Sequence, residues 1–193
     1  MNGLYALKPW YADRLSGLRH TLIRHRVSPH ALTALGVGFG AAAGAVLWLH
    51  KPGPLAAIAV LILLGARLAC ANLDGGVARD AGRTSKFGSV LNELGDRLAE
   101  FAAIGGLAGA APFAAVASAG LAGTLPSWVA LAGAAAGSDR VQGGPIGKTE
   151  RCLLLVVAAA TGWASPVLYV IAGGSLLTAG IRVRTVQKKL GAS

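Results

Sequence analysis

Acidic side chains, glycines and an arginine lie between Asp74 and Asp96, a stretch that joins two apolar segments. Asp74 is followed directly by two glycines and then by Arg79, and the stretch ends with Asn92 and Asp96. An ionisable side chain at membrane depth is energetically costly and by default marks a functional site. The pattern therefore predicts that the chemistry of this protein takes place between the two segments.

The spacing of the oxygen-bearing side chains indicates what that chemistry needs. Asn92, Asp96 and Glu100 recur every four residues, so they share one face of a helix, with Glu93 on an adjoining face. Carboxylates together with substrate phosphates are the ligands that Mg²⁺ and Mn²⁺ prefer. We expect the glycines after Asp74 to form a bend with room for a phosphate or nucleotide, whose charge the following arginine neutralises.

A purely structural network of ion pairs is the alternative interpretation. Arg97 lies within about one helical turn of both Glu93 and Glu100, which is the spacing of intrahelical ion pairs. Such a network leaves the regular spacing of the glycines, Arg79 and Asp96 without an explanation. The functional interpretation is therefore favoured.

The composition predicts an all-α integral membrane protein. The chain of 193 residues is 54% hydrophobic and 13% charged, with a mean hydropathy of +0.58, which is too apolar for an ordinary soluble domain. We expect a six-transmembrane-helix bundle, and a bundle with four spans is the alternative if the end of the chain is re-entrant. The expected spans are 31–49, 54–73, 89–110, 113–136, 152–165 and 167–181.

Basic residues predict the orientation of this bundle. Most of the 18 lysines and arginines precede the first span or fall in alternate loops, which is the positive-inside pattern. It places both termini and the Asp74–Asp96 stretch on the cytoplasmic side of a bacterial inner membrane. The net charge of +10 then reflects contact with anionic lipids, and no nucleic-acid recognition module accompanies it. With Cys70 and Cys152 both near this side, we expect no disulfide.

One membrane domain accounts for the chain, 1–193, with a juxtamembrane amphipathic helix at 10–28 and a helix bundle at 29–185. Tyr11, Leu15, Leu18 and Leu22 recur at helical spacing in the first of these segments. A solvated basic arm is the alternative for that segment.

A stripe of small residues marks the first expected span. Gly36, Gly40 and Gly44 are four residues apart and so share one face, which lets helix backbones approach closely. Packing inside one bundle is the favoured interpretation. The seam of a homodimer is the alternative.

The spacing within the acidic stretch resembles the signature of the CDP-alcohol phosphotransferases, membrane enzymes of phospholipid headgroup transfer. Their pattern is Asp-x2-Asp-Gly-x2-Ala-Arg-x8-Gly-x3-Asp-x3-Asp. Six of its eight fixed positions are matched, by Asp74, Gly75, Ala78, Arg79, Gly88 and Asp96. The Pro29–Thr33 stretch is similar to the family's opening of the first span, and 144–151 is similar to a loop before its fifth helix. The family has six transmembrane helices after a juxtamembrane helix.

The resemblance implies a reaction and a set of residue roles. An alcohol hydroxyl would attack the β-phosphorus of a CDP-linked lipid such as CDP-diacylglycerol, with release of CMP. Asp96 would be the catalytic base, and Mg²⁺ or Mn²⁺ would be held by Asp74, Asp96, Asn92 and Glu93. The expected substrate-binding residues are Gly75, Ala78, Arg79, Ser85, Gly88, His30, Thr33 and Lys148.

Two positions depart from the family pattern. Ala71 and Asn92 stand where the family has its first and third aspartates. Two divalent cations close together need anionic ligands to offset their repulsion, so a single metal held by Asp74, Asp96 and the diphosphate is the preferred expectation. A non-catalytic relative that binds a nucleotide-lipid or scaffolds a lipid-modifying partner is the second hypothesis. A small transporter is disfavoured, because no pair of broken helices recurs in two halves.

The acceptor alcohol is the least defined part of the expected reaction. Arg140, Lys148 and Arg151 form a basic cluster that suits an anionic acceptor such as glycerol 3-phosphate, as in a phosphatidylglycerophosphate synthase. The positive-inside rule predicts the same cluster without any acceptor.

Overall fold

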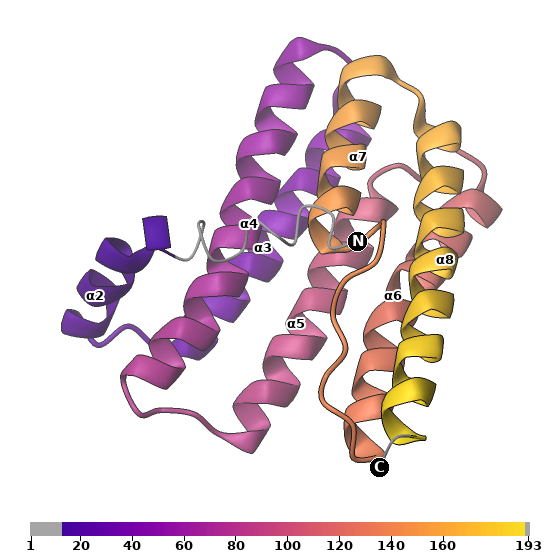
Figure 1. Ribbon diagram of the computed structural model, residues 1–193. Coiled ribbons are helices and arrows are strands. Elements are labelled where there is room, and N and C mark those ends of the chain that lie inside the picture. Colours follow the sequence, from indigo (N-terminus) through magenta and orange to yellow (C-terminus); the bar gives the residue numbers. More distant parts are fainter. Residues whose placement is uncertain (1–12, 192–193) are drawn as a thin grey trace.

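The computed structural model describes residues 13–191, and within that range the protein is all-helical, with no strand. Figure 1 shows a bundle of long helices with α2 beside it, away from the bundle axis. The helices are α2 (Ser16–Arg24), α3 (Pro29–Leu49), α4 (Pro54–Asp80), α5 (Lys86–Gly105), α6 (Phe113–Ala135), α7 (Lys148–Thr161) and α8 (Ala164–Leu190). The expectation of an all-α fold is confirmed.

Four of these helices, α3, α4, α6 and α8, are long and apolar enough to cross a membrane. Helix α5 has the length, but its inward-facing charged residues lower its hydropathy. Helix α7 has 14 residues, which at 1.5 Å per residue span about 21 Å against roughly 30 Å of hydrocarbon. The protein is therefore an integral membrane protein by the composition of four helices, and the count of six spans stays a prediction.

The glycine bend expected after Asp74 is absent. Gly75 and Gly76 lie inside α4, which continues as a helix to Asp80. Glycine costs a helix about 1 kcal/mol relative to alanine, and burial of Leu73 and Val77 on either side of the pair offsets this cost. Helix α4 therefore continues past residue 73, the expected end of this span, and it carries Asp74 and Arg79 on its last turns.

The N-terminal helix packs against the C-terminal end of α4. Leu15, Leu22 and Ile23 contact a small core formed by Leu73, Val77 and Leu32. The helix itself, Ser16–Arg24, is shorter than the expected 10–28, and the part up to residue 12, with Tyr11, lies outside the described residues. Its place at the membrane interface stays a prediction.

The glycine stripe of α3 forms a close helix contact inside the bundle. Gly36, Gly40 and Gly44 are all buried. A Cβ atom on Gly40 would lie 2.6 Å from the carbonyl oxygen of Ala99 in α5, and one on Gly36 would lie 3.4 Å from the Cβ of Cys70 in α4. The stripe therefore packs within one chain, as the favoured interpretation expected.

An extended segment, residues 136–147, runs along the bundle between α6 and α7 (Figure 1). Two residues of α8 hold it: Thr178 accepts a hydrogen bond from the backbone N–H of Ile146 (3.0 Å), and Arg182 donates to the carbonyl of Gly143 (2.9 Å). Because this segment covers part of the bundle's length without being helical, α7 is short and begins deep in the molecule.

Candidate active site

The four positions that carry acids in the family signature meet in space. Ala71 and Asp74 of α4 and Asn92 and Asp96 of α5 line one small cavity. The helical spacing explains this, because residues three or four apart share a face, and the two faces oppose each other. Only two of the four positions are carboxylates in this chain.

Asp74 is held by hydrogen bonds on both carboxylate oxygens. Its Oδ2 accepts from the Thr33 hydroxyl (2.9 Å) and from the Asn92 side-chain amide (2.6 Å), and its Oδ1 accepts from the backbone N–H of Gly75 (2.6 Å). The residue is only 4% exposed. Buried charge of this kind persists where hydrogen bonds compensate for lost water, and these contacts supply them.

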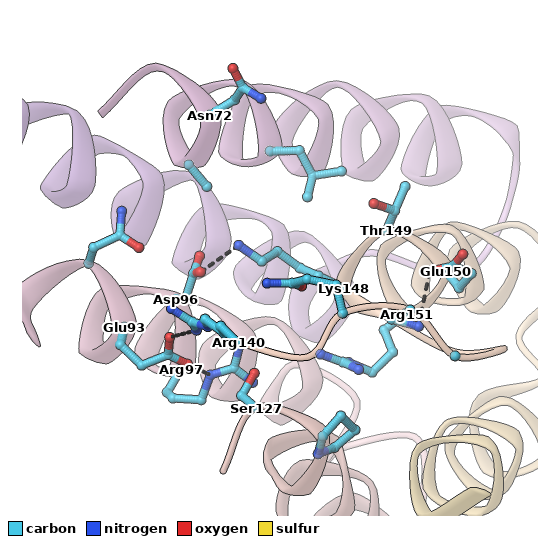
Figure 2. Close-up of a pocket in the computed structure, with 18 of the residues that line it drawn as sticks. Asn72, Glu93, Asp96, Arg97, Ser127, Arg140, Lys148, Thr149, Glu150 and Arg151 are labelled. Carbon is cyan, nitrogen blue, oxygen red and sulfur yellow. Dashed lines mark hydrogen bonds and ion pairs between the residues drawn. The ribbon is translucent and has the colours of Figure 1, made fainter. Parts of the chain in front are cut away.

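Asp96 is paired with a lysine from the other half of the chain. The ammonium of Lys148, at the start of α7, lies 2.5 Å from its Oδ2, and Figure 2 shows the lysine side chain reaching this carboxylate. The buried guanidinium of Arg67 donates to the backbone carbonyl of Asp96 (3.0 Å) and lies 4.0 Å from its Oδ1. Asp96 is thus fixed from both sides.

The remaining acids of α5 form ion pairs. Arg97 lies 2.5 Å from Glu100 and 3.7 Å from Glu93, and Arg151 of α7 also pairs with the buried Glu100. Arg140 pairs with Glu93 at 2.5 Å (Figure 2). The ion-pair network considered as the structural alternative therefore exists, next to the Asp74–Asp96 pair rather than in place of it.

A larger cavity of about 490 Å³ opens beside Asp96. Five cationic side chains and three anionic ones line it: Arg97, Arg140, Lys148, Arg151, Arg182, Glu93, Asp96 and Glu150. Asn72, Ser127 and Thr149 add uncharged polar groups to the lining. Its volume suits a small molecule, and the excess of cations favours an anionic one.

The other expected substrate-binding residues gather at the end of α4 and the start of α5. A Cβ on Gly75 would lie 3.2 Å from Nη1 of the exposed Arg79, so the guanidinium folds over this glycine, and Ala78 is half-buried nearby. The Ser85 hydroxyl accepts from the N–H of Gly88 (2.9 Å) as the N-cap of α5. A Cβ on Gly88 would meet His30 at 3.4 Å.

Two arginines were missed as site residues. Arg67 is 3% exposed and contacts Asp96, and Nη1 of Arg67 also lies 3.3 Å from the sulfur of Cys152. Arg182 lines the larger cavity and donates to the carbonyl of Pro126 (2.7 Å). The signal for Arg67 was its place inside an apolar span, whereas Arg182 looked like part of the basic end of the chain. Both cysteines are free.

The side chains present do not provide the ligand set of a two-metal centre. Among the described residues no three histidine, cysteine or acidic side chains gather around a common point. Of the four expected ligands, Glu93 is engaged by two arginines, and Asn92 presents its amide nitrogen to Asp74. The expectation of Mg²⁺ or Mn²⁺ stays a prediction, for a site whose two carboxylates already have other partners.

Comparison with known sequences identifies relatives of the chain. Residues 26–182 match the family model described as CDP-alcohol phosphatidyltransferase. The chain is 30% identical to an uncharacterised protein of Aquifex aeolicus over 199 aligned residues, and the alignment covers 95% of this chain and 94% of that protein. It is 29% identical to the inner membrane protein YnbA of Escherichia coli over 99 residues, about half the length of each.

Solved structures share the fold. Mycobacterium tuberculosis phosphatidylinositol phosphate synthase PgsA1 with CDP-DAG bound has a TM-score of 0.72 at 24% identity, over 91% of this chain and 94% of that one. The same synthase with manganese and citrate also has a TM-score of 0.72, over 92% and 90%. The helix arrangement, the motif spacing and the family model agree, and the chain belongs to the CDP-alcohol phosphatidyltransferase family of membrane transferases in phospholipid biosynthesis.

Proposed function

We propose that this protein transfers a phosphatidyl-type group from a CDP-linked lipid, with CDP-diacylglycerol as the first candidate, to the hydroxyl of a small alcohol and releases CMP. The observation that carries the proposal is the position of Asp96. Its carboxylate lies at the junction of the small cavity between α4 and α5 and the larger cationic cavity. Asp96 therefore stands between the motif residues of α4 and α5, which would hold the donor, and the larger cavity, which would take the acceptor.

The donor end is the junction of α4 and α5. Arg79 lies over Gly75, where a guanidinium can neutralise phosphate oxygens close to the helix backbone. Ser85, Gly88 and His30 are neighbours beside it and offer polar contacts for the nucleotide. The acyl chains of the donor would leave sideways between the apolar helices into the bilayer.

The larger cavity is the acceptor site in this proposal. Arg140, Lys148, Arg151 and Arg182 line it, and cations at this density favour an acceptor that itself carries a phosphate. Glycerol 3-phosphate is the named candidate to test first. The basic end of the bundle also faces the anionic lipids of the cytoplasmic leaflet, so we place the site on the cytoplasmic side of a bacterial inner membrane.

The proposed chemistry is one displacement at phosphorus. The acceptor oxygen forms a bond to the β-phosphorus, the bond from that phosphorus to the bridging oxygen breaks, and CMP leaves with the bond's electrons. Asp96 accepts the proton of the acceptor hydroxyl. Lys148 pairs with its carboxylate and Arg67 donates to its backbone carbonyl, while the cationic lining offsets the charge of the diphosphate.

The test is CMP release by purified protein in lipid vesicles that contain CDP-diacylglycerol and a pool of small alcohols with glycerol 3-phosphate among them. Each reaction is run with Mg²⁺, with Mn²⁺ and with EDTA. We expect release that depends on an acceptor and is lost in Asp96→Asn. The matched control is Asp139→Asn, which removes an exposed carboxylate that does not line the cavity. Normal turnover by Asp96→Asn would show that this carboxylate is not the base.

A second function is favoured by the two altered motif positions. With Ala71 and Asn92 in place of carboxylates, the chain would bind a nucleotide-lipid without turning it over, or scaffold a lipid-modifying partner. Saturable binding of CDP-diacylglycerol without CMP release under any of the three ionic conditions would support this function over the first. The retention of Arg79 and Asp96 favours the transferase.

A further inference from the structure

The contacts of Asp74 and Asp96 leave little opportunity for a divalent cation. Asp74 already accepts three hydrogen bonds, and a carboxylate has about four lone-pair sites in all, so little capacity is left to bind a metal. Asp96 accepts from an ammonium at 2.5 Å. A metal would have to displace a short charge-assisted contact on one carboxylate and an amide contact on the other.

Within the described part of the chain, the other two carboxylates of α5 are paired as well. Glu93 is paired with Arg97 and Arg140, and Glu100 is paired with Arg97 and Arg151. The cavity between Asp74 and Asp96 has a volume of about 10 Å³. A single water needs at least about 10–15 Å³, and Mg²⁺ keeps several waters when it binds to proteins.

The charge that a metal would supply is provided by side chains. Lys148 places one positive charge on Asp96, and Arg67 places a second within 4.0 Å. The Asn92 amide bridges α5 to Asp74 of α4, across the gap between two motif positions. An ammonium has three donors, so Lys148 keeps two for a phosphate while it holds Asp96.

We propose that the Lys148 ammonium and the Asn92 amide take the place of the divalent cation, so that this site binds its anionic ligand without Mg²⁺ or Mn²⁺. The identity of the ligand as a nucleoside-diphosphate lipid rests on the proposed function. The proposal replaces the sequence-based expectation of a metal held by Asp74 and Asp96. Its basis is the pairing of every described carboxylate around the motif with a cation or an amide.

The position of the lysine supports this assignment. Lys148 begins α7, and its backbone is set by the extended segment that Thr178 and Arg182 hold. Its side chain is 28% exposed and lines the larger cavity. The ammonium therefore meets both Asp96 and any anion that enters from that cavity.

The first measurement is binding of Mn²⁺ to the purified wild-type protein, followed by electron paramagnetic resonance of the free ion. We expect no stoichiometric binding. Wild-type binding of one ion per chain that disappears in Asp74→Asn would overturn the proposal. This readout needs no nucleotide-lipid, so it is independent of the proposed function.

A variant that carries carboxylates at both altered motif positions should gain the metal binding that the wild type lacks. The double variant Ala71→Asp, Asn92→Asp places four carboxylates around the small cavity, and we expect it to bind Mn²⁺ where the wild type does not. If the wild type binds Mn²⁺ as tightly as this variant, the Asn92 amide and the Lys148 ammonium do not take the place of a metal, and the proposal is wrong.

The second measurement is the affinity for CDP-diacylglycerol in EDTA and in Mn²⁺. We expect equal wild-type affinity in both, and a loss of about tenfold or more in EDTA for Lys148→Met, which removes a charged contact to phosphate. Lys188→Met, a change of an exposed lysine near the end of α8, is the control and should bind as the wild type.

Wild-type affinity that requires Mn²⁺, or Lys148→Met that binds as the wild type in EDTA, would overturn the proposal. A wild type that binds neither Mn²⁺ nor the nucleotide-lipid would support the metal-free site and count against the proposed donor. The two failures are thereby separated.

Discussion

At the scale of single residues, Glu100 is the acidic partner of two buried arginines. It is 5% exposed and is the shared partner of Arg97 and Arg151. Removing one member of a buried ion pair leaves uncompensated charge and costs about 3–5 kcal/mol. We expect Glu100→Gln to lower the free energy of unfolding by this amount, measured by thermal unfolding in detergent.

An exposed ion pair in the same protein provides the control for that change. Asp139 is 91% exposed and lies 3.2 Å from Lys189, and surface pairs of this kind contribute less than about 1 kcal/mol. We expect the free energy of unfolding of Asp139→Asn to differ from that of the wild type by less than about 1 kcal/mol. Equal unfolding temperatures for Glu100→Gln and Asp139→Asn would show that the buried network does not stabilise the fold.

At the scale of the elements, the contact of α3 with α5 depends on the absence of a side chain at Gly40. A Cβ there would lie 2.6 Å from the carbonyl of Ala99, and overpacking of this kind costs about 1–3 kcal/mol. We expect Gly40→Ala to lower the unfolding temperature. It should also reduce CMP release, because α3 carries Thr33, which contacts Asp74.

Gly38, on the same helix, tests whether crowding is the cause. It is exposed, and a Cβ there would have no neighbour within 4 Å. Alanine is favoured over glycine in a helix by about 1 kcal/mol, so Gly38→Ala should be as stable as the wild type or more stable. A similar loss in both variants would point to an effect of glycine on the helix itself and not to the α3–α5 contact.

The sequence was most informative where period and spacing decide the structure. The apolar runs predicted α3 and α6 almost to the residue, and helical spacing predicted that Asp74 and Asp96 would face each other. The glycines after Asp74 were misleading, because packing around Val77 outweighs their weak local preference. Propensity of single residues is a poor guide where tertiary burial opposes it.

The partner of Asp96 was beyond sequence reasoning. Lys148 follows Asp96 by 52 residues, and its position depends on how far the extended segment runs along the bundle before α7 begins. Contacts of Gly143 and Ile146 with α8 set that distance. Neither the apolar period nor the basic charge of this region contains such information, so the lysine could be named as a binding residue but not placed.

At the scale of the whole molecule, the two ends of the bundle should face opposite sides of the membrane. The α3–α4 and α7–α8 turns share one end, because the N–H of Gly53 donates to the carbonyl of Ala159 at 2.8 Å. The end of α8 meets the start of the extended segment through Lys189 and Asp139. This contact marks the second end of the bundle, and Figure 1 shows the α4–α5 connection at that end as well.

This arrangement predicts which sites a membrane-impermeant maleimide reaches in intact cells. Native Cys70 and Cys152 are buried, so the wild type should react little. Single cysteines at exposed Lys51 and Trp163 should react from outside, whereas Thr84→Cys should react only after the membrane is opened, because the positive-inside rule places its loop in the cytoplasm. Labelling of Thr84→Cys in intact cells would show that the orientation is the reverse of the expected one and that the site lies on the outer face. Opposite accessibility of the Lys51 and Trp163 variants would contradict six spans and the shared end of these two turns, since an odd number of helices would then cross the membrane between the two positions.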